Sequence, residues 1–408
     1  MVEALLIVGL AVAVFVGFNI GGSSTGVAFG PAVGSNTLSK LAAAALMSGF
    51  ALLGGWTVGR NVIATMGGEI VPQSQFTLAA SVTVLFFVGV ALLISNLFGV
   101  PASTSMTAVG AIAGLGVATD TIMWETMGRI VSWWLVSPIL AFWICAVVGR
   151  YLYPYLDAWF ALDRSDDPAW YLDRSGPIPI PRPTPGVRRR EVVGTVLVIA
   201  IACYMAFSAG ASNVANAVAP LVGAGAVPGV AMFGSTDVAI LIGGGAIGLG
   251  AFTIARRTLD TVGNDLTDLP LLAALVVETI SASLITFLSV IGIPASLAVS
   301  ATMCIVGLGW GRATRTTKLS QLPDAAKGAM AGEKAGPGVT IDALAADGKG
   351  GATDVRDVPS IGEEDPAALT AGDLFDPAAT ARVVVLWVVT PTVAAVAAYL
   401  VFRFVPFV

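Results

Sequence analysis

The sequence predicts an all-α polytopic membrane protein made of two inverted-topology repeats of about five helices each, with broken or re-entrant half-helices at the midplane. The chain is 56% hydrophobic and 12% charged, whereas soluble domains carry about 25% charged residues. Most of its apolar runs have about 20 residues, which is the length needed to cross a bilayer. In addition, the glycine, proline and serine positions of residues 99–116 recur in residues 292–309.

Residues 1–150 are assigned to the first transmembrane repeat. The first apolar run follows Glu3 rather than a basic segment, so we expect a retained helix and not a cleaved signal peptide. The segment 21–35 is too rich in glycine and polar residues for a helix that faces lipid. The predicted helices of this half lie at about 4–20, 38–58, 75–97, 100–117 and 129–149.

The second repeat is interrupted by a long polar insertion before its last helix. A polar linker at 151–191, expected in the cytoplasm, leads into residues 192–311, which hold the first four helices. An acidic loop rich in Gly and Ala at 312–379 follows, and its composition predicts cytoplasmic disorder. Residues 380–408 supply the last transmembrane helix. The predicted helices of this half lie at about 192–209, 229–252, 270–291, 293–311 and 380–404.

The two halves share three sequence blocks in the same order. Residues 18–34 correspond to 207–223, 99–116 to 292–309, and 129–138 to 382–391. Five crossings per half, an odd number, would invert the second repeat relative to the first. With the N-terminus outside, only Arg60, Arg129 and Arg403 of the 21 Lys and Arg would lie outside, which agrees with the positive-inside rule. Inverted repeats with broken helices near the midplane are typical of secondary transporters.

The composition also excludes several classes of function. Histidine is absent, and Cys145, Cys203 and Cys304 lie singly in apolar runs without metal-ligand or disulfide spacing. The sequence has no pattern for a nucleophile–base pair or for nucleic-acid binding. We therefore expect no enzyme, no metal or other cofactor and no nucleic-acid partner. The tryptophans interpreted as anchors at the membrane interfaces are Trp56, Trp124, Trp133, Trp134 and Trp387.

The two broken segments predict a site for an anion. Each has a proline two residues after a glycine and then a serine, which predicts a helix that starts at membrane depth with free backbone N–H groups. Such a helix start attracts anions. The alternative is that the hydroxyls bond back to helix carbonyls or join helices, but their recurrence in both halves favours a ligand site. The candidate oxyanion ligands here are Ser103, Thr104, Ser105 and Ser296.

Two segments of small residues, 21–35 and 210–223, carry further candidate ligands. Close helix packing would explain their glycines and alanines, but amide side chains inside a membrane are costly unless they are paired or hydrated. Their N–H groups suit an anion, and their carbonyl oxygens suit a cation such as Na⁺. The candidate anion ligands in these segments are Ser23, Ser24, Thr25, Ser212, Asn213 and Asn216.

A cation that couples transport would have a partly overlapping set of ligands. Glu278 lies inside an apolar run, and a carboxyl group at membrane depth is a functional candidate by default. The alternative for Glu278 is an ion pair with an arginine such as Arg257. The candidate cation-coupling residues are Asn19, Ser24, Asn213, Asn216 and Glu278.

These motifs resemble those of the inorganic phosphate transporter (PiT) family. That family carries the segments Gly-Ala-Asn-Asp-Val-Ala-Asn-Ala and Gly-Leu-Pro-Val-Ser-Thr-Thr-His once in each half. The first resembles residues 21–28 and 210–217, and the second resembles 99–106 and 292–299. The resemblance implies a multi-pass permease of the cell membrane that carries inorganic phosphate, with Na⁺ or H⁺ as the coupling ion. It leaves open whether the protein is a homodimer in the lipid bilayer.

The chain departs from the family pattern at several charged or titratable positions. The family's Asp falls on Ser24 and Asn213, and its His falls on Met106 and Val299. A Glu of the second helix falls on Leu46, and Glu278 is interpreted as its counterpart in the second half. The loss of two carboxylates removes strong ligands for hard cations.

Two alternative functions therefore stay open beside phosphate transport. Sulfate is one alternative substrate, because it has no proton to donate at neutral pH, whereas protonated phosphate needs acceptors for its O–H groups. The other alternative is a protein that does not transport, such as an anion sensor or a membrane scaffold, with the acidic loop 312–379 as a partner-binding segment.

Overall fold

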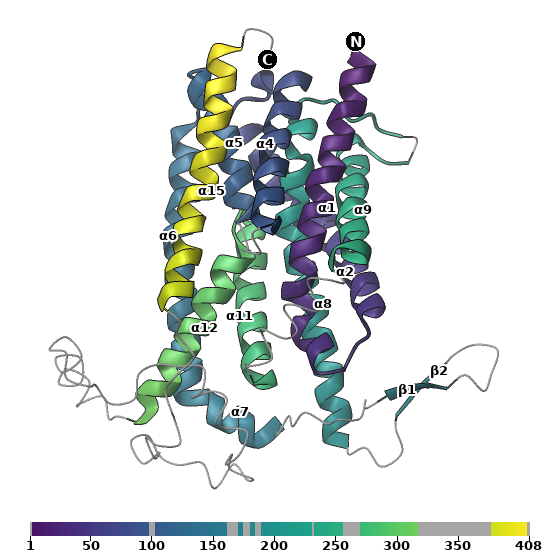
Figure 1. Ribbon diagram of the computed structural model, residues 1–408, viewed down its shortest axis with the longest axis vertical. Helices are drawn as coiled ribbons and strands as arrows, with labels where there is room; N and C mark the ends of the chain where they lie inside the picture. Colours follow the sequence, from purple (N-terminus) through teal and green to yellow (C-terminus); the bar gives the residue numbers. More distant parts are fainter. Residues whose placement is uncertain are drawn as a thin grey trace, which may run out of the picture.

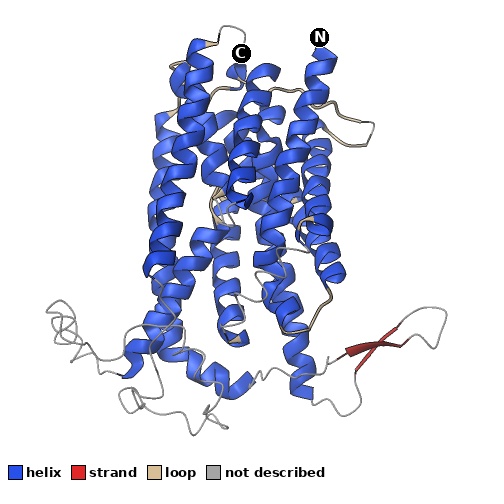
Figure 2. Cartoon of the chain, viewed as in Figure 1, coloured by secondary structure: helices blue, strands red, loops and turns tan. Residues whose placement is uncertain are grey.

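The computed structural model describes residues 2–97, 103–160, 170–173, 180–183, 189–230, 232–255, 270–316 and 377–405. The described chain is a bundle of long helices with one short two-stranded sheet beyond its end (Figure 2). Six helices are long and apolar enough to cross a membrane, or seven if one bent pair counts as a single span. The all-α polytopic membrane fold is therefore confirmed.

The first half has a helix at each predicted position. The helices are α1 (Val2–Gly34), α2 (Lys40–Trp56), α4 (Leu78–Leu97), α5 (Thr104–Ala118) and α6 (Trp124–Val147). Helix α1 is longer than predicted, because it continues without a break through most of the polar segment 21–35. This part of α1 is largely buried in protein, in agreement with the expectation that it does not face lipid.

The second predicted helix is present as α2, but a further helical segment that was not predicted follows it at an angle. Helix α2 ends at Trp56, and α3 (Gly59–Ala64) continues into a π-helical segment at Thr65–Glu69. The two parts are bent by 62°, as in a broken span or a re-entrant segment. Sequence reasoning placed the broken segments around 99–116 and 292–309 and missed this one.

The second half also has a helix at each predicted position. They are α8 (Arg189–Gly223), α9 (Ser235–Thr253), α11 (Leu271–Val290), α12 (Leu297–Ala313) and α15 (Pro377–Phe404). The linker holds α7 (Tyr153–Phe160) and the antiparallel strands β1 (Trp170–Asp173) and β2 (Ile180–Pro183). Most of the acidic loop predicted at 312–379 lies outside the described residues.

The halves are interleaved, and their contacts are reciprocal. Helix α1 packs on α9 while α2 packs on α8, and α5 packs on α15 while α6 packs on α12. The close crossings repeat as well: a Cβ on Gly21 would lie 1.9 Å from the Ile247 carbonyl oxygen, and a Cβ on Gly210 would lie 2.0 Å from that of Ala51. Glycine is therefore required where α1 crosses α9 and where α8 crosses α2.

The directions of the helices agree with this reciprocal packing of the two halves. The start of α1 and the end of α15 lie at one end of the bundle, whereas α7, β1 and β2 lie at the other (Figure 1). Helix α8 starts from that second end, so α1 and α8 run in opposite directions (Figure 1). The inverted repeat stays a prediction, and both the reciprocal packing and the helix directions support it.

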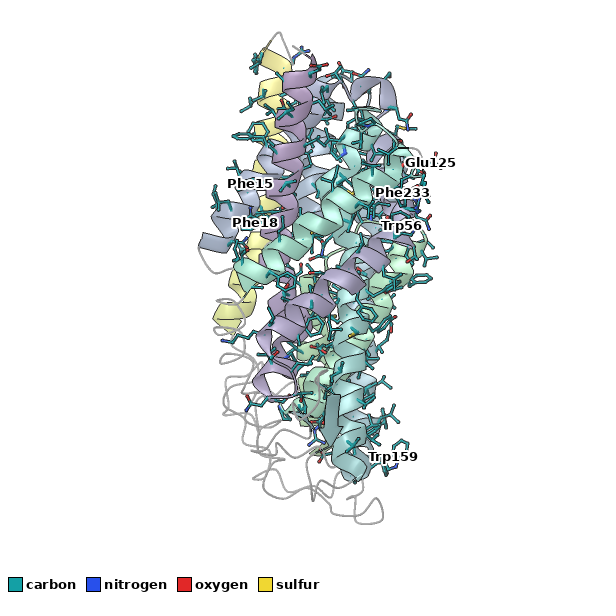
Figure 3. All side chains as sticks on the ribbon, turned by 90° about the vertical axis from the view of Figure 1, so that its right-hand side faces the viewer. Phe15, Phe18, Trp56, Glu125, Trp159 and Phe233 are labelled. Carbon is teal, nitrogen blue, oxygen red and sulfur yellow. The ribbon has the colours of Figure 1, made fainter. Side chains whose placement is uncertain are left out.

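The tryptophans divide into two groups, which corrects part of their interpretation. Trp124 and Trp159 are 72% and 64% exposed, and Trp159 lies near the opposite end of the bundle from Glu125, the neighbour of Trp124 (Figure 3). Exposed tryptophans near both ends fit interface anchors. Trp387, in contrast, is buried and packs against the partly buried Trp134, so Trp387 is not a membrane anchor.

Candidate functional site

The starts of α5 and α12 have the same capping geometry. Ser103 has an extended backbone before α5, and its Oγ accepts a hydrogen bond from the Met106 N–H at 3.4 Å. Ser296 does the same before α12, where its Oγ accepts from the Val299 N–H at 3.4 Å. Each serine thus satisfies one of the free donors of its helix start, and the remaining N–H groups keep the partial positive charge of the helix end.

The hydroxyl groups of α5 meet the amide groups of α8, from the other half. Thr104 Oγ1 donates to Asn213 Oδ1 at 2.6 Å, and the hydroxyl oxygens of Ser105 and Ser212 lie 3.2 Å apart. Asn216 Nδ2 lies within hydrogen-bond distance of Ser105 Oγ, Asn213 Oδ1 and Thr104 Oγ1, at 3.1, 3.0 and 3.3 Å. We call these five residues the polar cluster.

The polar cluster is neutral, and all of its residues are buried except Thr104, which is partly exposed. Ser105, Ser212 and Asn216 are fully buried, and Asn213 is 5% exposed. Asn216 Oδ1 accepts no hydrogen bond from the residues that the structure describes. Hydroxyl and amide groups both donate and accept, and hydroxyl hydrogens rotate freely. An oxyanion could therefore replace the internal bonds and accept O–H and N–H bonds from both halves.

The corresponding polar segment of α1 is separate from this cluster. Ser23 Oγ lies 3.3 Å from the Asn19 carbonyl oxygen, and Thr25 Oγ1 donates to that of Gly21 at 2.6 Å. Ser24 is buried on the same helix. Within the described part of the chain, the side-chain hydrogen bonds of residues 23–25 go to their own helix and none joins them to the polar cluster or to Ser296. The sequence alternative of hydroxyls that bond back to their own helix thus holds for Ser23 and Thr25, but not for the polar cluster.

Asn19 has a partner that sequence reasoning missed. Asn96, near the end of α4, donates from Nδ2 to Asn19 Oδ1 at 3.1 Å, and Asn19 Nδ2 donates to the Phe15 carbonyl at 2.9 Å. Asn19 is 2% exposed. A polar residue near the end of an apolar run, three positions before Gly99, was the available signal for Asn96.

Glu278 lies in α11 with its carboxyl group buried. The side chain is 4% exposed, and neither carboxyl oxygen has a hydrogen-bond partner among the described residues. The interpretation of Glu278 as the counterpart of Leu46 stays a prediction, and the helix order does not favour it, because Leu46 lies on the second long helix of its half and Glu278 on the third. The match of Gly99 with Gly292 pairs Glu278 with Leu85 instead. The alternative partner Arg257 lies outside the described residues.

The turn before α12 is fixed by residues of both halves. Gly292 has φ of 74°, a left-handed conformation that favours glycine. Asn61 of α3 donates to the Val290 carbonyl at 2.7 Å, and Ser212 of α8 donates to that of Ala295 at 2.7 Å. Trp134 of α6 donates its indole N–H to the Pro294 carbonyl, also at 2.7 Å. These bonds set the position of Ser296.

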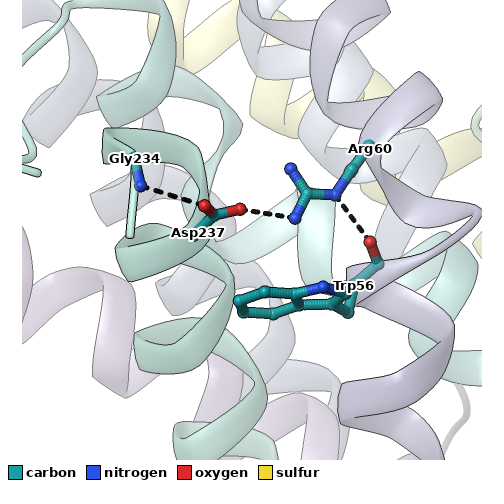
Figure 4. Close-up of polar contacts among 4 residues, drawn as sticks. All are labelled: Trp56, Arg60, Gly234 and Asp237. Atoms are coloured by element: carbon teal, nitrogen blue, oxygen red, sulfur yellow. Dashed lines mark hydrogen bonds and ion pairs between the residues drawn. The ribbon is translucent and has the colours of Figure 1, made fainter. Parts of the chain in front are cut away.

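A second set of contacts joins the break in α2 and α3 to the start of α9. Arg60 forms an ion pair with Asp237, donates from Nε to the Trp56 carbonyl at 2.6 Å, and lies over the Trp56 ring (Figure 4). Asp237 also accepts from the Gly234 N–H at 2.9 Å and thereby caps α9 (Figure 4). The pair is partly exposed and links α3 of the first half to α9 of the second.

This fold and this neutral, buried cluster between two interleaved halves define a polytopic membrane carrier, not an enzyme. The chain belongs to the phosphate transporter family, whose model matches residues 20–172 and 181–328. The family predicted from the motifs is therefore confirmed.

The individual relatives cover most of the chain. A sulfate permease, CysP of Bacillus subtilis (strain 168), is 29% identical over 299 residues, which are 73% of this chain and 75% of that protein. A solved structure described as the sodium-dependent phosphate transporter has a TM-score of 0.67 at 17% identity and covers 98% of both chains. This likeness shows that the two chains share a fold.

Proposed function

We propose that this protein is a secondary active permease that carries inorganic phosphate across the cell membrane by cation-coupled symport. Membership of the phosphate transporter family supports the substrate class. The observation that carries the proposal is the polar cluster, in which hydroxyls at the start of α5 meet amides of α8. A tetrahedral oxyanion has oxygen atoms on all sides, so it can accept hydrogen bonds from hydroxyl and amide groups that surround it.

The anion site is formed by the start of α5 and the facing part of α8. Thr104, Ser105 and Ser212 offer hydroxyl groups, and Asn216 offers an amide N–H. The capped end of α5 adds its partial positive charge without a titratable group. Because the ligands come from both halves, a movement of one half against the other would open the site and release the anion, as in alternating access.

The coupling cation is assigned to amide oxygens and one carboxyl group. Asn213 Oδ1 accepts hydrogen bonds from Thr104 and Asn216, which are also proposed anion ligands. A Na⁺ bound at Asn213 Oδ1 would therefore lie beside the anion, and the binding of each ion would favour the binding of the other. Asn19 offers its side-chain oxygen on α1, and Glu278 offers a buried carboxyl group on α11. The sodium dependence in the description of the solved relative supports Na⁺, while a carboxyl group that exchanges a proton supports H⁺.

Sulfate is the second candidate substrate, and one observation favours it. The polar cluster holds no carboxylate, because Asn213 stands where the family has Asp, and Ser24 stands at the matching position of α1. A protonated phosphate must donate its O–H to an acceptor, whereas sulfate at neutral pH only accepts. The similarity to a sulfate permease agrees with this preference.

Uptake into proteoliposomes tests the proposal. The purified full-length protein is reconstituted, and ³²P-phosphate and ³⁵S-sulfate are supplied in turn under separate Na⁺ and pH gradients. Phosphate uptake that depends on one gradient and is lost in Ser105→Ala is expected. Sulfate uptake without phosphate uptake would establish the second candidate, and binding without uptake of either anion would favour a sensor.

A further inference from the structure

Four apolar side chains meet beside the starts of α5 and α12, and we call them the central cluster. They are Met106, Trp134, Val299 and Trp387. Met106 and Val299 are the third residues of α5 and α12, one turn after the capping serines. The central cluster therefore lies next to the residues assigned to anion binding, and each of its four residues comes from a different helix.

The two tryptophans occupy matching places in the two halves. Each stands four residues before a proline, Pro138 in α6 and Pro391 in α15. The packing of their helices corresponds too, because a Cβ on Gly114 would lie 2.4 Å from the Ala395 carbonyl oxygen. The equivalent contact in the other half joins Gly307 to the Phe142 carbonyl oxygen, at 2.1 Å.

The indole N–H groups of this pair differ in their partners. Trp134 Nε1 donates to the Pro294 carbonyl at 2.7 Å. Trp387 is 9% exposed, and its buried Nε1 has no hydrogen-bond partner in the part of the chain that the structure describes. A buried donor without an acceptor is costly, so its retention points to an acceptor that arrives with a ligand.

We propose that Trp387 donates its indole N–H to the transported oxyanion and is a specificity-determining ligand of the site. The hydrogen bond from Trp134 Nε1 to the Pro294 carbonyl shows how far an indole at this position reaches. Pro294 lies two residues before the capping Ser296. Trp387 lies in the central cluster with Met106, two residues after Thr104, so an anion held at the start of α5 would lie within reach of its N–H.

The chemistry of the indole group sets the expected preference. An indole N–H donates and does not accept, so it favours an oxygen that carries no proton. Sulfate offers four such oxygens, whereas protonated phosphate offers fewer. The Met106 and Val299 side chains beside it exclude water from this contact and supply no acceptor. Trp387 therefore raises affinity for both anions and for sulfate more.

Equilibrium binding tests this role, which rests on the proposed oxyanion site. Dissociation constants for ³⁵S-sulfate and ³³P-phosphate are measured on the full-length protein for Trp387→Phe and for the matched control Trp134→Phe. Trp387→Phe is expected to weaken sulfate binding about 10- to 100-fold, the range for a hydrogen bond to a charged group. Trp134→Phe leaves the Pro294 carbonyl without this donor, and it is expected to change the dissociation constant for sulfate only a few-fold.

Unchanged affinity for both anions in Trp387→Phe would overturn this assignment and leave the proposed function standing. Absence of binding by the wild-type protein would overturn both. If Trp387→Phe does not fold, ¹⁵N-tryptophan labelling of the protein decides. An indole N–H resonance that moves downfield on addition of sulfate, and that persists in Trp134→Phe, is expected. Indole resonances that do not respond to either anion would contradict the role of Trp387.

Discussion

The starts of α5 and α12 share one backbone design and differ in their side chains. Both are capped by a serine in the same way. After the cap, α5 continues with Thr104 and Ser105, whereas α12 continues with Leu297 and Ala298. The hydroxyls of α5 enter the polar cluster, while the turn before α12 is held through its backbone carbonyls by Asn61, Ser212 and Trp134.

We infer from this difference that the starts of α5 and α12 have different roles in the proposed anion site. In the proposed site, the start of α5 supplies side chains as anion ligands, and the start of α12 supplies a backbone position fixed by hydrogen bonds. The sequence suggested that most anion ligands come from the first half. The structure refines that expectation, because the amide partners come from α8 of the second half and the matching segment of α1 stays apart.

The first prediction asks whether the scaffold is as symmetric as the helix crossings suggest. Gly21→Ala and Gly210→Ala each place a Cβ about as close to a facing carbonyl oxygen, at 1.9 and 2.0 Å. Each is expected to cost about 1–3 kcal/mol or more of stability through overpacking. Thermal unfolding in detergent measures the loss.

Gly49→Ala is the matched control, because Gly49 is a helical glycine with nothing within 4 Å of the added Cβ. It is expected to stabilise α2 by up to about 1 kcal/mol. A normal melting temperature in one crossing variant and a low one in the other would show that the two crossings are not equivalent.

The second prediction concerns Glu278 and its repeat counterpart Leu85, where one half has a buried acid and the other a buried aliphatic residue. Glu278→Gln keeps the shape and removes the charge that a cation or proton would use. Gradient-driven uptake is expected to fall about tenfold or more, the factor for 1.4 kcal/mol of lost cation binding, while anion exchange at equal gradients continues.

Anion counterflow and gradient-driven uptake are measured on the same proteoliposomes. Leu85→Met, a conservative change at the counterpart position, serves as the control for packing. Full gradient-driven uptake in Glu278→Gln would remove the carboxyl group from the coupling scheme and would leave the amide oxygens as the cation ligands.

The sequence predicted features that depend on repeated patterns, but it could not predict contacts between side chains of different helices. Apolar runs and the recurrence of 99–116 in 292–309 predicted the helices and the two capped starts. They could not show that Ser105 meets Ser212, since that contact depends on how α5 packs against α8. The burial of Trp387 was missed for a similar reason, because it depends on neighbouring helices and not on the apolar run around Trp387.

The break between α2 and α3 was missed on different physical grounds. The run 38–58 is largely apolar, and its glycines near position 55 also fit a helix with close neighbours. The bend of 62° places Asn61 beside the turn before α12, which is a tertiary contact without a local signal. The mapping of Glu278 onto Leu46 meets the same limit, because matching single residues between halves needs the helix order, which places Leu46 on α2 and Glu278 on α11.

The smallest effect is expected from the pair Ser23 and Ser212, which hold matching positions in α1 and α8. Ser212→Ala removes a bond to the Ala295 carbonyl and a contact with Ser105, so anion affinity is expected to fall about tenfold. Ser23→Ala removes only a bond to its own helix, which contributes little, and affinity is expected to change less than about twofold. Equilibrium binding of radiolabelled phosphate and sulfate compares the two variants. Equal losses of anion affinity in the two variants would mean that the α1 segment also contacts the anion. The two halves would then not differ in their contribution to the anion site.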